Sequence, residues 1–452
     1  MMEMTVQKHM YSDRQLRNLI VPLVMEQFLG IFVGMLDTMM VSSVGEAAIS
    51  GVSLVNEVNF LVIAVMGAVA TGGAVIVSQY LGYGDRNFSD RAAGQLVLIS
   101  FLIPLVFMIA ALCFGRGIIG GLYRQIDADV MDAAVIYFRI TALSFPLLGL
   151  YNSGAALFRC MSRTNTTMRV SLLMNLINLA GNYIGIFILR IGVRGVAYPT
   201  LISRGTAAVI ILYLCFRSDL EISLRLQNII AWNKDVIRRI LSIAVPNGVE
   251  NGLFQLGKVL VAGVVATLGT SQIAANGVAN SLGSLAYITD SAMGMAVVTV
   301  VGRCVGAGDY EDAKYLIIRT LKIAMVLEAV SSLPMAATLP LTIPLYTLTG
   351  ETAALVRRII LIDAVATTVL HSIAFVLPNA LRAAGDAKYT MYAGILSMFV
   401  CRLFGGWLLA KVFGFGVIGV WIGMFIDWIV RCICFAVRYR SGKWMNYRVV
   451  GN

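Results

Sequence analysis

Charged residues are scarce in this sequence of 452 residues. Only 13% are Asp, Glu, Lys or Arg, whereas 59% are hydrophobic, and the charged share is about half that of an ordinary soluble protein. A water-soluble globular enzyme and a disordered chain are therefore excluded, because neither could keep so much apolar surface out of water. The apolar runs are about 20 residues long, which predicts membrane-spanning helices and not the alternating strands of a β-barrel.

Residues that bind metals or attack substrates are also few. The chain has two histidines, His9 and His371, and seven cysteines without a CxxC pair, so neither a zinc site nor a disulfide framework is supported. The Gly-rich stretches LGYGD (81–85) and VGAGD (305–309) lack the Gly-Lys-Ser/Thr ending of a phosphate loop, and we interpret them as helix stops and tight turns. We expect a protein that is not an enzyme and holds no bound cofactor or resident metal.

Lys and Arg outnumber Asp and Glu, which gives a formal net charge of +11. We attribute the excess to cytoplasmic loops and not to nucleic-acid binding. One set of segments, made of both termini and every second loop, carries about 23 Lys and Arg, against about 7 in the other set. Both termini are therefore predicted to be cytoplasmic. The N-terminal segment 1–15 is polar and lacks a cleavage signal, so the first span is expected to stay in the mature protein.

Charged or Gly-rich breaks divide the apolar sequence into twelve predicted spans. We assign them to an N-lobe (1–217) and a C-lobe (236–452), joined by a polar cytoplasmic linker (218–235). The spans lie near residues 17–43, 47–81, 92–115, 128–158, 165–189, 193–216, 237–266, 271–302, 315–339, 350–381, 389–411 and 414–437.

The two halves resemble each other at a nearly constant offset. An offset of 224 places Glu26 on Glu250 and LGYGD on VGAGD, and an offset of 223 places Arg159 on Arg382 and Thr167 on Thr390. Six spans per half give both halves the same orientation, related by a two-fold axis along the membrane normal. Two parallel six-helix bundles are an architecture typical of transporters, in which rocking of the halves exposes a cleft to each side in turn.

Ionisable residues at membrane depth are costly, which makes each of them a functional candidate. Asp37 lies on the first span, one turn after Gly34, and a desolvated carboxylate there is suited to taking up a proton or holding Na⁺. The alternatives are a helix cap or a hydrogen bond to Thr38. On the fifth span Asn175, Asn178 and Asn182 form one polar stripe, which could coordinate a cation or bridge helices by hydrogen bonds.

Two glutamates, one histidine and several methionines each allow a functional and a structural interpretation. Glu26 and its repeat mate Glu250 fit either an inner gate or packing at helix ends. His371 suits a second, proton-coupled site, or it is simply hydrogen-bonded. A smaller set of methionines could line an adaptable substrate cavity or merely fill core and lipid-facing positions. These are Met35, Met39, Met66 and Met293, with Met295 as a further member.

The order and spacing of several motifs resemble the multidrug and toxic compound extrusion (MATE) family of secondary antiporters. The matching stretches run over essentially the whole chain. They are PLVMEQFLGIFVGMLDTMMVSSVGEAAISGVS (22–53), AVIVSQYLGYGD (74–85), YFRI (137–140), the Asn stripe, VRGVAYPTLIS (193–203), LGTSQIAANGVANSL (268–282) and VVTVVGRCVGAGDYEDAK (297–314).

The resemblance implies an all-α membrane fold of two six-helix lobes, V-shaped around a central cavity. It also implies rocker-switch export of organic cations and amphiphiles against H⁺ or Na⁺. The ion-coupling residues that it implies are Asp37, Tyr137, Asn178, Asn182 and Thr200, with Na⁺ bound, if at all, at Asp37, Asn178 and Asn182. The second position on the fifth span is often Asp in the family, and the neutral Asn182 leaves one carboxylate, which weakens attraction for Na⁺.

We therefore expect an exporter of small cationic molecules, monomeric in a bacterial plasma membrane, with H⁺ or Na⁺ as coupling ion and Asp37 as the principal coupling group. The alternative is a lipid-linked oligosaccharide flippase of the wider superfamily. A flippase needs a strongly cationic cavity for pyrophosphate and often has two more helices, whereas this sequence has few intramembrane Arg or Lys.

Overall fold

The computed structural model describes residues 9–123, 126–346 and 348–450; residues 1–8 of the polar N-terminal segment lie outside this range. The described residues form helices joined by short loops, with no strand among them, so the all-α prediction is confirmed. Ten of the described helices are long and apolar enough to cross a membrane, and eleven if the bent pair of α4 and α5 counts as one span.

The chain forms two compact units. The N-terminal unit is Asp13–Gly248; the C-terminal unit begins at Val249 and also includes residues 9–12. The division therefore falls inside one long helix, α9. The N-terminal unit holds α1 (Asp13–Ser42), α2 (Glu46–Tyr83), α3 (Arg86–Leu122), α4 (Ala128–Ala142), α5 (Phe145–Cys160), α6 (Thr164–Tyr183), the π-helical turn η1 (Ile184–Ile188), α7 (Arg194–Cys215), α8 (Leu226–Ile230) and the first half of α9 (Lys234–Ala266).

The C-terminal unit contains the second half of α9 and several helices with short π-helical or 3₁₀ turns. A break near Tyr287 divides the predicted eighth span into two helices, α10 and α11. The elements are α10 (Thr270–Ala286), α11 (Ile288–Ala307), α12 (Tyr310–Ala337), α13 (Leu339–Thr342), η2 (Ile343–Leu345), α14 (Gly350–Ala366), η3 (Thr367–His371), α15 (Ser372–Phe375), α16 (Leu377–Ala383), α17 (Ala387–Ser397), η4 (Met398–Gly405), η5 (Leu408–Val412), α18 (Gly416–Arg440) and η6 (Lys443–Tyr447).

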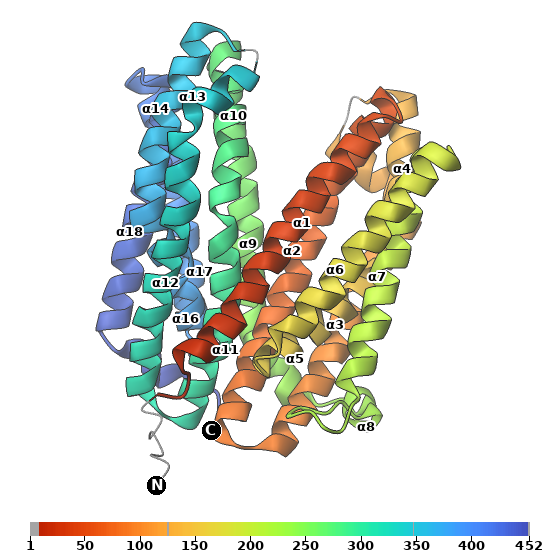
Figure 1. Cartoon of the computed structure of the whole chain (residues 1–452), viewed down its shortest axis with the longest axis vertical. Helices are drawn as coiled ribbons and strands as arrows, with labels where there is room; N and C mark the ends of the chain where they lie inside the picture. The colour runs from red at the N-terminus through yellow and green to blue at the C-terminus, as the bar shows by residue number, and fades with distance from the viewer. Residues whose placement is uncertain (1–8, 124–125, 347, 451–452) are drawn as a thin grey trace. The chain divides into compact units, whose positions relative to one another are not determined.

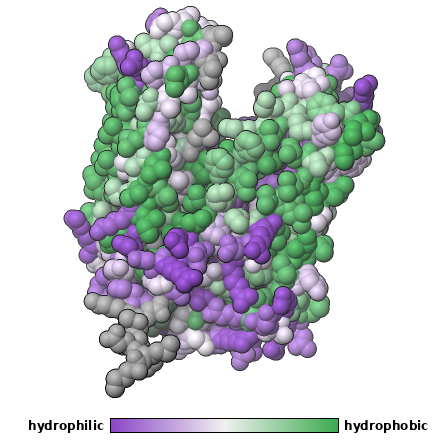
Figure 2. All heavy atoms as spheres, in the orientation of Figure 1, coloured by the Kyte–Doolittle hydropathy of each residue, from purple (hydrophilic) through white to green (hydrophobic). Residues whose placement is uncertain are grey.

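Apolar side chains cover much of the outside of each unit. Val209 and Tyr213 on α7 are 67% and 72% exposed, and Val330 on α12 is 66% exposed. On the face drawn in Figure 2, hydrophobic residues cover the middle of each unit, while hydrophilic residues gather towards one end. Such surfaces are unfavourable in water and suit the hydrocarbon interior of a bilayer, which supports the membrane assignment.

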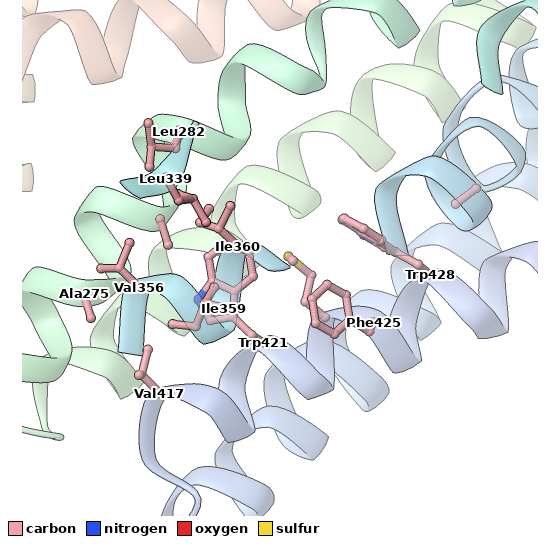
Figure 3. Packing of buried hydrophobic residues seen from close by; sticks show 13 residues of the cluster. Ala275, Leu282, Leu339, Val356, Ile359, Ile360, Val417, Trp421, Phe425 and Trp428 are labelled. Carbon is pink, nitrogen blue, oxygen red and sulfur yellow. The ribbon is translucent and has the colours of Figure 1, made fainter. Parts of the chain in front are cut away.

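Aromatic residues of α18 fill the interior of the C-terminal unit. Trp421, Phe425 and Trp428 are buried in one cluster with Ile359 and Ile360 of α14, which also receives small side chains from α10. Trp421 lies beside the two isoleucines, and Trp428 lies further along α18 (Figure 3). In the N-terminal unit α1 packs along α6 and α6 along α7 (Figure 1). These contacts bring the polar residues of α1, α6 and α7 next to one another.

The two Gly-rich stretches have the same structure in both units. Gly84 and Gly308 each end a helix in the left-handed conformation, with φ of 83° and 79°, which glycine adopts without steric cost. Asp85 and Asp309 then begin the next helix, each accepting a 2.9 Å hydrogen bond from a backbone N–H three residues on. The prediction of helix stops and tight turns is confirmed.

Close helix contact at Gly149 yields a stability prediction. A Cβ at Gly149 on α5 would overlap the backbone carbonyl of Ser100 on α3, whereas a Cβ at Gly117 on α3 meets nothing within 4 Å. We expect Gly149→Ala to lower the stability of the purified protein by about 1–3 kcal/mol, the usual cost of overpacking. The measurement is the thermal melting temperature in detergent. Gly117→Ala is the matched control, and equal melting of the two variants would contradict this packing.

Candidate functional site

Asp37 lies inside α1, so its carboxylate is not a helix cap. The hydroxyl of Thr38 donates to the carbonyl of Gly34 at 3.0 Å, which also argues against the second alternative, a carboxylate held by Thr38. No neighbouring atom lies within 4 Å of a Cβ placed at Gly34. This part of α1 is therefore open, and it can accept polar neighbours from another helix.

Two amides of α6 hold the carboxylate of Asp37. Asn182 donates from Nδ2 to Asp37 Oδ1 at 2.8 Å. The amide of Asn178, in the orientation that satisfies both of its neighbours, donates to Asp37 Oδ2 at 2.9 Å and accepts from Thr200 Oγ1 at 3.2 Å. The structure therefore brings together Asp37, Asn178, Asn182 and Thr200, which the sequence analysis grouped. Two N–H donors at one carboxylate stabilise its anionic form.

Asp37 lines a cavity of about 260 Å³ within the N-terminal unit. Tyr137 of α4, another predicted residue, is buried at the same cavity and lies 3.4 Å from Asn56 Oδ1 through its hydroxyl. Asn182 lies just behind, fully buried. Of the Asn stripe, Asn175 and Asn178 line the cavity. The complete lining is Gly34, Asp37, Thr38, Val41, Ile49, Val52, Ser53, Asn56, Tyr137, Met174, Asn175, Asn178, Val196, Thr200, Ser203 and Arg204.

Arg204 is a further residue of this cavity that the sequence did not predict for the site. Arg204 lies one helical turn after Thr200 on α7, lines the cavity with Asp37 and donates to Ser144 Oγ at 2.8 Å. One acid and one guanidinium thus share the cavity, which leaves it close to neutral while Asp37 is ionised. Its position inside a predicted span was the signal that could have identified it.

Glu26 and Glu250 occupy matching ion-pair clusters, one in each unit. Glu26 lies 3.9 Å from Arg159 and accepts a 3.0 Å hydrogen bond from Thr167. We call such a set of one glutamate, one arginine and one threonine a Glu–Arg–Thr brace. The internal repeat aligns its three residues with Glu250, Arg382 and Thr390.

In the C-terminal unit the brace is tighter. Glu250 is 2.6 Å from Arg382, whose Nε donates to Thr390 at 3.2 Å, and it lies 4.0 Å from Arg431. Arg431 is in turn paired with Asp427 at 2.9 Å. Both glutamates are buried and held within their own unit, which favours the packing interpretation; the gate remains a prediction.

His371 lies in a buried cluster with two acids. Its Nδ1 is 2.7 Å from Asp290 Oδ2 and 2.8 Å from Glu328 Oε1. The hydroxyl of Ser372 contacts the other oxygens of the same two carboxylates. As ionisable residues inside predicted spans, Asp290 and Glu328 are candidates from the sequence too, but the sequence does not connect them with His371. We call Asp290, Glu328, His371 and Ser372 the C-terminal cluster.

Four of the five methionines proposed for a substrate cavity are divided between two environments. Met35 and Met39 on α1 are exposed, at 47% and 69%, whereas Met66 and Met293 are buried. None of the four lines the cavity at Asp37. Their contact with a transported molecule remains a prediction.

Comparison with known proteins identifies one family. The family model MatE matches residues 22–184 and again residues 246–408, and the second match follows the first at the same offset as the internal repeat. A solved structure described as the outward-facing conformation of a multidrug resistance MATE family transporter of the MOP superfamily superimposes with a TM-score of 0.87. It is 20% identical and covers 96% of both chains; at this identity the likeness shows the fold.

Two curated relatives extend over nearly the full chain. The protein named "Uncharacterized transporter YisQ" of Bacillus subtilis is 27% identical over 433 residues, covering 94% of this chain and 93% of that protein. The protein named "Probable multidrug resistance protein NorM" of Thermotoga maritima is 24% identical over 444 residues, covering 97% and 94%.

The two braces yield a paired stability prediction. Glu250→Gln leaves Arg382 buried without its counter-charge, so we expect a loss of about 3–5 kcal/mol, the cost of breaking a buried ion pair. Glu26→Gln removes a longer contact and should cost less. Melting temperatures of the two purified variants give the comparison, and a larger loss for Glu26→Gln would contradict the difference in geometry.

Proposed function

Because this chain belongs to the MatE family, a family of membrane transporters, we propose that it exports small organic cations by antiport against protons, with Asp37 as the coupling group. The proposal places the protein in a bacterial plasma membrane with both termini in the cytoplasm, working as a monomer. The names of relatives such as the Thermotoga maritima protein support multidrug molecules as cargo.

The carboxylate of Asp37 at a cavity, with donors on both oxygens, is the observation that supports this proposal. A proton that binds there removes a negative charge from the cavity and leaves the guanidinium of Arg204 without its counter-charge. The cavity then repels a cationic cargo. When the proton leaves, the carboxylate attracts the next cation.

The amide of Asn178 lets the site accommodate a proton with little rearrangement. A protonated Asp37 carries an O–H donor, which conflicts with an N–H aimed at the same oxygen. Turning the amide by half a rotation points its oxygen at Asp37 and its nitrogen at Thr200 Oγ1, 3.2 Å away. Thr200 can accept there because its own hydroxyl donates to the carbonyl of Val196 at 2.9 Å.

The charge of the cavity supports H⁺ over Na⁺ as coupling ion, because a single carboxylate that shares its cavity with a guanidinium attracts Na⁺ only weakly. Among the described residues, Asp37 is the one carboxylate that lines this cavity. The flippase alternative has less support, because Arg204 is the single basic residue in the described cavity lining.

In the proposed cycle Asp37 takes up a proton from outside and the cargo leaves. The two units then rock, the proton is released to the cytoplasm, and a new cation binds. In each cycle one proton binds to Asp37 from outside and is released inside. The inward proton gradient is therefore the proposed energy source.

Asp37→Asn tests this assignment in cells. The amide fills the same space but carries no charge to lose, so we expect resistance to cationic drugs to fall to that of cells without the transporter. Protein level in the membrane and melting temperature should stay near those of the wild type. Asp129→Asn, which changes an exposed acid of the same unit, is the matched control and should keep full resistance. Full resistance of Asp37→Asn would overturn the proposal.

A further inference from the structure

We propose that the C-terminal cluster binds one divalent transition-metal ion, of the class of Zn²⁺, through Asp290, Glu328, His371 and Ser372. The proposed function does not use this cluster, since its coupling group lies in the N-terminal unit. The four residues come from elements that are far apart in the chain. Asp290 lies on α11, Glu328 on α12, and His371 and Ser372 lie where η3 meets α15.

The donor atoms converge on one point. The oxygens of Asp290 and Glu328 and a ring nitrogen of His371 all lie within 4.8 Å of one another. Ligand atoms around a tetrahedral zinc ion, with bonds of about 2.0–2.2 Å, lie about 3.3–3.6 Å apart, so small side-chain rotations are needed to place these atoms around one ion. The hydroxyl of Ser372 lies 2.8 Å from Glu328 Oε2 and 3.2 Å from Asp290 Oδ1. These side chains provide the mixed oxygen and nitrogen ligands that bind transition metals.

Hydrogen bonds alone do not satisfy the four contacts. Nδ1 of His371 carries at most one hydrogen but faces two carboxylate oxygens at 2.7 and 2.8 Å. The Ser372 hydroxyl likewise has one hydrogen for two carboxylates. With both acids ionised, two hydrogens thus serve four short contacts, whereas a metal ion would satisfy the ring nitrogen and both acids at once.

The charges also favour a divalent ion. Asp290 is 4% exposed, His371 6%, and Glu328 and Ser372 are fully buried. Without a metal, two ionised acids and a protonated imidazole leave one negative charge at membrane depth, where unpaired charge is expensive, so a neutral metal-free cluster needs a proton on one acid as well. Two ionised acids, a neutral imidazole and a divalent cation sum to zero. An imidazole ligand selects zinc and its neighbours over Mg²⁺ or Ca²⁺, which prefer oxygen alone.

The other half of the chain shows that the fold does not need this polar cluster. At the repeat offset, the positions of Asp290 and Glu328 are Met66 and Pro104. At the offset of 223, which applies to the later spans, His371 and Ser372 correspond to Leu148 and Gly149. Gly149 packs against the Pro104 ring just as Ser372 contacts Glu328. The N-terminal unit therefore builds the same helix junction from apolar residues. A purely structural role does not account for two acids and a histidine there.

Aromatic side chains fix the imidazole in place. Tyr287 stacks on His371 with ring centroids 4.6 Å apart, while Phe375 and Trp428 approach it at 4.4 and 4.9 Å. An apolar shell of this kind orients a ligand and keeps water out. It should favour a closed, four-ligand site with slow metal exchange.

The test uses the purified full-length protein in detergent, stripped by a chelator and incubated for hours with Zn²⁺ alone. Elemental analysis after desalting should find one zinc per chain, and Co²⁺ in its place should give the visible absorption of a four-coordinate site. Glu328→Gln and Asp290→Asn should each weaken zinc binding at least tenfold. Asp129→Asn should bind zinc as the wild type does.

The outcome is independent of the antiport proposal. Asp37→Asn should still bind one zinc, even though we expect it to be inactive in export. Less than one tenth of a zinc per wild-type chain would overturn the metal site and indicate that the cluster shares protons only. Unchanged binding in both acid variants would overturn it as well, because the metal would then lie elsewhere. If one acid variant fails to fold, the other and His371→Asn decide the question.

Discussion

A carboxylate at membrane depth must be matched by donors or positive charge inside its own helix unit, and the described chemistry of this chain follows from that constraint. In a bilayer no water is present to solvate an anion. Glu26 and Glu250 meet the requirement with arginine and threonine partners, and Asp37 meets it with two amides. In the braces each glutamate is paired with an arginine, so the ionised form of the glutamate is stabilised throughout. The Asp37 carboxylate is held by neutral donors at a cavity, which leaves its charge free to change.

Duplication explains the scaffold but not the sites. The Gly-rich turns and the Glu–Arg–Thr braces recur in both units at the same offset. The repeat position of Asp37 is Val261, and that of Glu328 is Pro104. Each unit has therefore added its own ionisable cluster to a shared frame of helices. This division separates the proposed coupling site from the proposed metal site.

The sequence alone predicted the features that depend on local pattern. Apolar runs predicted the helices, the nearly constant repeat offset aligned the residue pairs that form the two braces without predicting their contacts, and helical spacing placed Asn178 and Asn182 on one face. Contacts between helices far apart in the chain were harder to foresee. The spacing of residues on α7 indicates that Arg204 follows Thr200 by one turn, but not that it shares a cavity with Asp37. His371 was identified as unusual without its acids, because α11, α12 and η3 meet only after packing, and a π-helical turn ends at His371 itself.

The decisive measurement of proton coupling through Asp37 is transport in proteoliposomes, with a pH gradient and a Na⁺ gradient imposed in separate experiments on the wild type and Asp37→Asn. We expect the wild type to move a cationic dye uphill with the pH gradient and not with the Na⁺ gradient, and the variant to do so with neither. Uphill transport by Asp37→Asn at the wild-type rate under the pH gradient would contradict proton coupling through Asp37.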